Sequence, residues 1–196
     1  MTRYLTGTHP LTIDEFTAPD MVPRLAALLR EVHALAPIEG VFDPYADIRR
    51  WLALLDTRGA TRPDRLPPLL ARIDETERRR APARGSEKAL CHNDPYHLNF
   101  LDDGSLWLID WEYAGMGDPM YDLASIGHVL DRDGRDLLLE SYFGSVEPQT
   151  HRDLEDLNAV VVCWNVVWSL VQANGGVAGF EYLDFTEELL DSISDQ

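Results

Sequence analysis

Apolar residues recur at helical spacing over most of the chain. Leu25, Leu28, Leu29 and Val32 stand at i, i+3, i+4 and i+7 and form one apolar face of a helix that ends near Ala34. The further helices predicted in the same way cover residues 43–55, 63–80, 121–130, 135–143, 150–173 and 185–193. The pattern therefore predicts a mainly α-helical protein.

The middle of the chain has a different pattern. Two short apolar runs, residues 99–101 and 106–109, are separated by the sequence DDGS (102–105). Asp-Gly between two apolar runs is a strong signal for a β-hairpin, so we predict a hairpin over residues 99–110. Residues 3–16 contain β-forming residues and a Gly-Thr-His-Pro turn and predict an extended lead-in.

The sequence favours a cytoplasmic protein without membrane insertion. Its longest apolar stretch, residues 159–171, is interrupted by Asn165 and Ser169 and has 13 residues. A bilayer span takes roughly 20 residues, so we expect a buried helix. The N-terminus lacks the apolar core of a signal peptide. Cys91 and Cys163 have no CxxC spacing, which disfavours a disulfide framework and a zinc site.

The charge balance narrows the class of ligand. The chain has 196 residues, with 17 Lys+Arg against 34 Asp+Glu, and a net charge of −17. Such acidity repels phosphate backbones and anionic lipid surfaces, which disfavours nucleic-acid binding and favours cationic or metal-bridged ligands.

Residues 90–112 read LCHNDPYHLNFLDDGSLWLIDWE and carry the candidate chemistry. Asn99 lies at the entry of the first predicted strand and Asp110 ends the second, so the hairpin brings the two together at its open end. Carboxylate and amide oxygens suit Mg²⁺. Asp94 lies a few residues earlier, where it can accept a proton from a hydroxyl that attacks a phosphate. This order of residues matches phosphoryl-transfer enzymes of the kinase type.

Two other residues of this segment have alternative interpretations. His92 is interpreted as a structural residue that holds the loop rather than as a catalyst. Glu112, two residues after Asp110, is either a metal contact or a surface carboxylate.

The sequences HNDPYHLN (92–99) and LIDWEYAGMGDPMYDLA (108–124) resemble the choline/ethanolamine kinases, within the aminoglycoside phosphotransferase-like kinases of protein-kinase-like fold. The resemblance implies a mainly helical C-terminal lobe with a small hairpin, and ATP as phosphate donor. It implies Asp94 as catalytic base, Asn99 and Asp110 as Mg²⁺ ligands, and Asp122 as the carboxylate that braces the catalytic loop. The Asp-x-Glu formed by Asp110 and Glu112 is closer to these kinases than to protein kinases, which have Asp-Phe-Gly.

The C-terminal aromatic residues resemble those that wall a quaternary-ammonium pocket in choline kinases. The spacing of Trp164 and Trp168 alone indicates core residues of an apolar helix. Together with the sequence WSLVQA (168–173) and the aromatic residues after it, we favour the pocket for Trp168 and Tyr182. For Trp164 and Phe185 both interpretations stay open. The acceptor implied is a small cation such as choline or ethanolamine, which aromatic faces attract.

The resemblance makes residues 1–16 the remnant of an N-terminal-lobe strand or hinge, and residues 17–196 a helical C-terminal lobe with catalytic loop 92–99. Kinases hold the nucleotide phosphates with a glycine-rich loop and a lysine of the N-terminal lobe. No GxGxxG precedes the catalytic segment, and Lys88, the only lysine, lies just ahead of it. We therefore expect that catalysis needs an N-terminal lobe, and that the chain binds such a lobe or self-associates.

Three functions remain open at this point. The first is a choline/ethanolamine kinase, the second an inactive module that binds choline or another cation, and the third a kinase for an aminoglycoside or another small-molecule hydroxyl.

Overall fold

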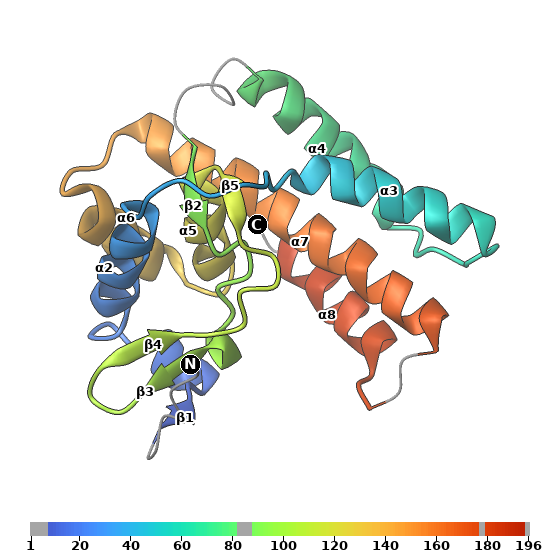
Figure 1. The fold of residues 1–196 in the computed structure, drawn as a ribbon. Helices are drawn as coiled ribbons and strands as arrows, with labels where there is room; N and C mark the ends of the chain where they lie inside the picture. Colours follow the sequence, from blue (N-terminus) through green and yellow to red (C-terminus); the bar gives the residue numbers. More distant parts are fainter. Residues whose placement is uncertain (1–7, 82–87, 177–178, 195–196) are drawn as a thin grey trace. The chain divides into compact units, whose positions relative to one another are not determined.

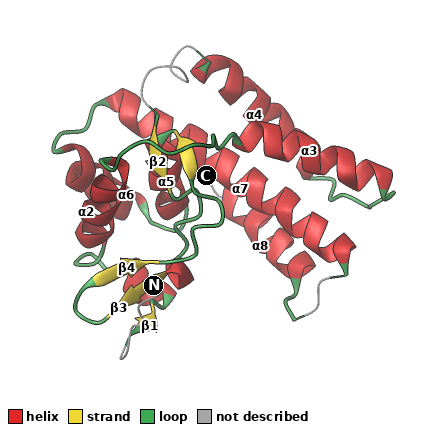
Figure 2. Cartoon of the chain, viewed as in Figure 1, coloured by secondary structure: helices red, strands yellow, loops and turns green. Residues whose placement is uncertain are grey.

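The computed structural model describes residues 8–81, 88–176 and 179–194 (Figure 1). The chain divides into two compact units. Unit 1 comprises Met1–Phe42 and Glu87–Leu154, and unit 2 comprises Asp43–Ser86 and Glu155–Gln196. Helices form most of both units, and all described strands belong to unit 1 (Figure 2). The predicted mainly α-helical fold with a small hairpin is confirmed. Residues 3–7 of the predicted lead-in lie outside the described residues.

The helices of unit 1 surround a core to which α2 (Val22–His33) contributes one face. Leu25 and Leu29 of this face are fully buried, as the helical periodicity predicts. Helix α2 packs against α6 (Arg132–Phe143), and both contact α5 (Pro119–Gly127). These three helices support the catalytic segment.

The predicted hairpin consists of β3 (Phe100–Asp102) and β4 (Leu106–Leu108), paired antiparallel with Phe100 opposite Leu108. Gly104 in the turn has a φ of 98°, a conformation that glycine adopts without steric cost. Strand β1 (His9–Pro10) adds a third, antiparallel strand beside β3. Backbone pairing continues past the strands, because the Ile109 N–H donates to the Asn99 carbonyl at 2.9 Å.

The extended lead-in predicted for residues 3–16 is wrong at its end, where α1 (Ile13–Phe16) forms a single helical turn. A capping box explains this turn. The Glu15 N–H donates to Thr12 Oγ1 at 3.3 Å, and the Thr12 N–H donates to Glu15 Oε2 at 2.8 Å.

A second sheet of unit 1 has no counterpart in the sequence prediction. Strand β2 (Ala89–Cys91) pairs antiparallel with β5 (Gly115–Gly117), and Val41 makes an isolated parallel bridge to Met116. Strand β2 directly precedes the catalytic loop, and β5 follows the hairpin a few residues later. This sheet therefore fixes both ends of the stretch that carries the candidate chemistry.

Unit 2 is helical in its described part. It contains α3 (Pro44–Thr57), α4 (Leu66–Arg80), α8 (Tyr182–Ser194) and most of α7 (Pro148–Gly175), which begins in unit 1. The predicted cap of α3 is present, since Asp43 Oδ1 accepts hydrogen bonds from the backbone N–H groups of the first turn. Helix α4 is joined to α7 by a bidentate ion pair between Arg79 and Asp156.

Helix α7 covers the helix predicted over residues 150–173, and the polar residues within its apolar stretch remain helical. The Asn165 side-chain amide donates to the Val161 carbonyl at 3.0 Å, and Ser169 Oγ donates to the Tyr182 carbonyl at 2.7 Å. With 28 residues, α7 is the one described helix whose length and composition would suffice to cross a membrane. Since 72% of its most apolar window is buried, its apolar character is that of a core helix, as expected.

Candidate active site

Asp122 organises the start of the catalytic loop. It lies in the first turn of α5, is fully buried, and accepts hydrogen bonds from the backbone N–H groups of His92 at 2.8 Å and Asn93 at 2.7 Å. His33, the last residue of α2, places its Nε2 at 3.0 Å from Asp122 Oδ2. The carboxylate thus joins two helices to the loop, at the position for which the resemblance implies a brace.

His92 connects the loop to the end of the hairpin. Its Nε2 lies 2.8 Å from the Ile109 carbonyl, which only accepts, so Nε2 carries the proton. Its Nδ1 then accepts the Asp94 N–H at 3.3 Å. Burial lowers the pKa of His92, which favours this neutral form, and its ring packs edge-on against Trp111 at 4.8 Å. These contacts place His92 as a support of Asp94.

Asp94 and Asn99 are in direct contact. The Asn99 side-chain amide donates to the Asp94 carbonyl at 2.9 Å and to Asp94 Oδ2 at 3.2 Å. Burial raises the pKa of Asp94 to about 7, and the negative charges of Asp110 and Glu112 add to this shift. A carboxyl group with a pKa near neutrality is suited to proton transfer.

Asp110 and Glu112 extend the acidic site at the open end of the hairpin. Both are exposed, and Asp110 has a φ of 63°, a left-handed conformation that Asp tolerates better than most residues. Because the Asn99 carbonyl accepts the Ile109 N–H, Asn99 and Asp110 lie near one another, as the hairpin predicts. Together with Asp94, they offer carboxylate and amide oxygens of the kind that Mg²⁺ binds, so the residues present fit this ion.

Two supporting residues were missed by the sequence analysis. Asn93 has a φ of 68°, and its side-chain amide donates to the Tyr113 carbonyl at 2.8 Å and the Cys91 carbonyl at 3.3 Å. Asn is enriched in this left-handed conformation, and that preference was the available signal. His33 gave no such signal, because it is 89 residues from Asp122 in sequence.

One further cluster in this unit could in principle hold a metal ion. His33, Cys91 and Asp122 offer ligand atoms within 4.8 Å of one another. Asp122 and His33 already use these atoms in hydrogen bonds with the loop and with each other. Cys91 Sγ lies 3.6 Å from the Ala89 carbonyl, and burial raises the pKa of its thiol. Hydrogen bonding accounts for the cluster without a metal.

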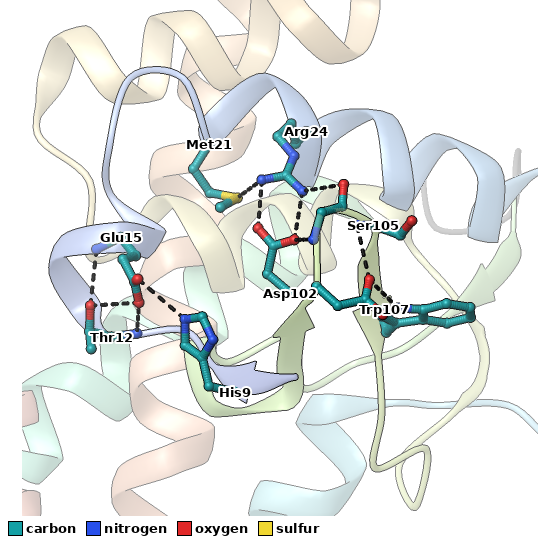
Figure 3. Close-up of polar contacts among 10 residues, drawn as sticks. His9, Thr12, Glu15, Met21, Arg24, Asp102, Ser105 and Trp107 are labelled. Atoms are coloured by element: carbon teal, nitrogen blue, oxygen red, sulfur yellow. Dashed lines mark hydrogen bonds and ion pairs between the residues drawn. The ribbon is translucent and has the colours of Figure 1, made fainter. Parts of the chain in front are cut away.

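The turn of the hairpin is anchored to α2. Arg24 forms a bidentate ion pair with Asp102, with nitrogen–oxygen distances of 2.7 and 3.0 Å (Figure 3). This pair lowers the pKa of Asp102 and raises that of Arg24. On the side of β1, His9 reaches Glu15 of the capping box at 3.3 Å (Figure 3). The hairpin is thus held at its turn and along its β1 edge.

The C-terminal aromatic residues lie in unit 2 and divide into two groups. Tyr182 packs edge-on against Trp168 at 5.7 Å and against Phe180 at 5.0 Å, and Phe180 contacts Phe185 at 5.5 Å. Trp164 is 2% exposed and packs against Trp51 at 4.9 Å. The structure therefore brings Trp168, Tyr182 and Phe185 into one cluster through Phe180, while Trp164 has the surroundings of a core residue.

The fold and the sequence place the chain in a family of phosphotransferases. The profile of the phosphotransferase enzyme family (APH) matches residues 1–157, and the chain belongs to this family. It is 26% identical to protein LicA of Haemophilus influenzae over 208 residues, which cover 98% of this chain and 74% of LicA.

Solved structures show the same fold. A choline/ethanolamine kinase family protein from Mesorhizobium loti has a TM-score of 0.87 and 26% identity, covering 99% of this chain and 68% of that one. The choline kinase LicA from Streptococcus pneumoniae has a TM-score of 0.78 and 20% identity, covering 98% and 69%. The predicted resemblance to choline/ethanolamine kinases is confirmed, and the chain spans about two thirds of the length of these structures.

Proposed function

We propose that this chain contributes the catalytic and acceptor-binding parts of a kinase that transfers the γ-phosphate of ATP to the hydroxyl of a small cationic amino alcohol, such as choline or ethanolamine. The observation that carries the proposal is the contact of Asp94 with Asn99, beside Asp110 and Glu112, in a loop whose backbone is bound by Asp122.

In this proposal Asp94 orients the acceptor hydroxyl and takes its proton while the oxygen attacks the phosphorus. Proton transfer of this kind contributes roughly 10²–10⁴-fold to the rate. Asn99, Asp110 and Glu112 would hold Mg²⁺, which neutralises charge on the phosphates when it is bound. His92 and Asp122 keep Asp94 in place through the hydrogen bonds of the loop backbone.

The aromatic cluster of unit 2 is the proposed acceptor site. Trp168, Tyr182 and Phe185 present ring faces that attract a quaternary or primary ammonium group, each worth roughly 0.5–2 kcal/mol. The burial of Trp164 and its contact with Trp51 favour a packing role for this residue. The net charge of −17 adds a long-range attraction for cations.

Phosphoryl transfer also needs groups that hold the nucleotide phosphates. Kinases of this fold use a glycine-rich loop and a lysine of the N-terminal lobe. We include in the proposal that this chain acts together with such a lobe, as part of a cytoplasmic enzyme.

Two measurements test the proposal. Thermal shift assays with Mg²⁺-ATP and with choline, each added separately, should both raise the melting temperature, because a ligand at 100 times its Kd stabilises by roughly 2.7 kcal/mol. Phosphocholine or phosphoethanolamine should form in a ³¹P NMR assay when an N-terminal lobe is added to the chain. A folded protein with no shift from either ligand and no product would refute the proposal.

A matched pair of variants separates the roles. Asp94→Ala should abolish phosphoryl transfer and leave choline affinity within a factor of a few, whereas Asp133→Asn, an exposed acid on α6, should change neither. A choline shift without any turnover would identify a cation-binding module instead. Turnover of an aminoglycoside but not of amino alcohols would identify the third function.

A further inference from the structure

A half-buried tyrosine contacts the histidine that binds Asp122. The hydroxyl of Tyr142, from α6, lies 2.7 Å from His33 Nδ1, and the two rings meet edge-on at 5.7 Å. The His33 side chain is 4% exposed, and its other nitrogen, Nε2, lies 3.0 Å from Asp122 Oδ2. A continuous chain of hydrogen bonds thus runs from α6 through α2 and α5 to the backbone of the catalytic loop.

Both carboxylate oxygens of Asp122 already accept backbone N–H groups, so His33 Nε2 donates to Asp122 Oδ2. The Tyr142 hydroxyl, which can donate or accept, forms the hydrogen bond with His33 Nδ1. Burial raises the pKa of Tyr142 to about 12, so that its proton is retained at neutral pH.

We propose that Tyr142 is a positioning residue, which fixes the ring orientation of His33 and through it the carboxylate of Asp122 against the catalytic loop. A histidine held at one nitrogen only can rotate about the bonds of its side chain, whereas one held at both nitrogens cannot do so without breaking a hydrogen bond. The loop amides of His92 and Asn93, which bind Asp122, precede Asp94 directly. The effect on catalysis rests on the proposed function, but the effect on the loop does not.

The first test measures the loop itself. Tyr142→Phe should increase amide hydrogen exchange at His92 and Asn93 on the order of tenfold, the loss expected for one partly buried hydrogen bond. It should also move the ¹⁵N resonance of His33 Nδ1 toward the position of a nitrogen without a hydrogen bond. Tyr45→Phe, which removes a buried hydroxyl from unit 2, is the matched control and should change neither signal. Unchanged exchange and an unchanged Nδ1 resonance would overturn the proposal.

The second test asks whether Tyr142 acts through His33. In a His33→Ala background, Tyr142→Phe should add less than a twofold change in exchange at His92 and Asn93, because the intermediate group is gone. An undiminished effect would mean that Tyr142 acts by another route. Should Tyr142→Phe fail to fold, His33→Gln is the alternative, because its side chain offers an amide donor to Asp122 and a carbonyl acceptor to Tyr142. This variant should retain slow amide exchange at His92 and Asn93. Fast exchange at these two residues would contradict the proposal.

The third test concerns catalysis in the full chain with its N-terminal lobe. Tyr142→Phe should lower kcat by roughly three- to tenfold and leave KM for the acceptor within twofold, because Tyr142 supports the loop without touching substrate. A three- to tenfold rise in KM with an unchanged kcat would contradict a positioning role. Absence of activity in the unmodified protein would refute the proposed function and leave the exchange measurements valid.

Discussion

Removing the carboxylate of Asp122 should destabilise unit 1 more than any change at the surface. The side chain is fully buried and binds three N–H groups, from the backbone of His92 and Asn93 and from His33. In Asp122→Ala all three donors lose their acceptor, and each buried unsatisfied group costs about 1–3 kcal/mol. Local rearrangement and entry of water recover part of this sum, so we expect a loss of about 3–5 kcal/mol.

A loss of this size is a large part of the stability of a domain, which is typically about 5–15 kcal/mol. Asp122→Asn keeps the shape but replaces one acceptor oxygen by a donor, so that it should fall between Asp122→Ala and the unmodified protein. Asp133→Asn, an exposed acid on the neighbouring helix α6, should change the free energy of unfolding by less than about 0.5 kcal/mol.

Urea denaturation followed by circular dichroism measures these free energies. Because the chain forms two units, unfolding in two steps is one outcome, and the effect must then fall on the transition of unit 1, which contains Asp122. A loss below about 1 kcal/mol for Asp122→Ala would refute the reasoning, since three buried donors would then have found other partners.

Three further predictions follow from the same structure. Arg24→Met should lower the free energy of unfolding by about 0.5–1 kcal/mol, because the Arg24 side chain is 39% exposed, and the difference should shrink in high salt. Without Mg²⁺, Asp94→Asn should stabilise the protein at high pH, because the pKa of Asp94 rises from 3.8 to about 7 on folding. The unmodified protein therefore loses stability relative to the variant as the pH rises from about 4 to about 7. Urea titrations at several pH values should show this difference reach at most about 4 kcal/mol, and a constant difference would contradict it. Trp168→Ala should weaken choline binding by about 2–30-fold in calorimetry, with the melting temperature as a check on folding.

The sequence predicted those elements that are determined by residues a few positions apart. The Asp43-Pro44 sequence specified the start of α3 because an Asx side chain and a first-turn proline act within one helical turn. The Asp-Gly pair specified the turn of the hairpin in the same way, through the φ of Gly104. The cause of the single helical turn α1 is also local, because Thr12 and Glu15 form a capping box. The prediction of an extended segment over residues 3–16 overlooked the spacing of these two residues.

Elements that depend on distant partners could not be predicted in this way. Strands β2 and β5 are three residues each, and what stabilises them is their pairing with one another across the whole catalytic segment. Similarly, the histidine at the end of α2 looked like an ordinary residue of a helix terminus. Its contact with Asp122 exists only because the fold brings α2 and α5 together.

Helix α2 supports both parts of the catalytic segment. Near its start Arg24 binds the turn of the hairpin, and at its end His33 binds Asp122 and so the loop. The two residues are nine positions apart, which in a helix is about 14 Å. The rise of the helix fixes this distance, and the buried Leu25 and Leu29 hold the helix in the core. Helix α2 therefore contributes to the position of Asp94 relative to the hairpin, together with the contacts of His92 and Asn99, and a change that shifts α2 should affect the proposed base and the proposed metal ligands together.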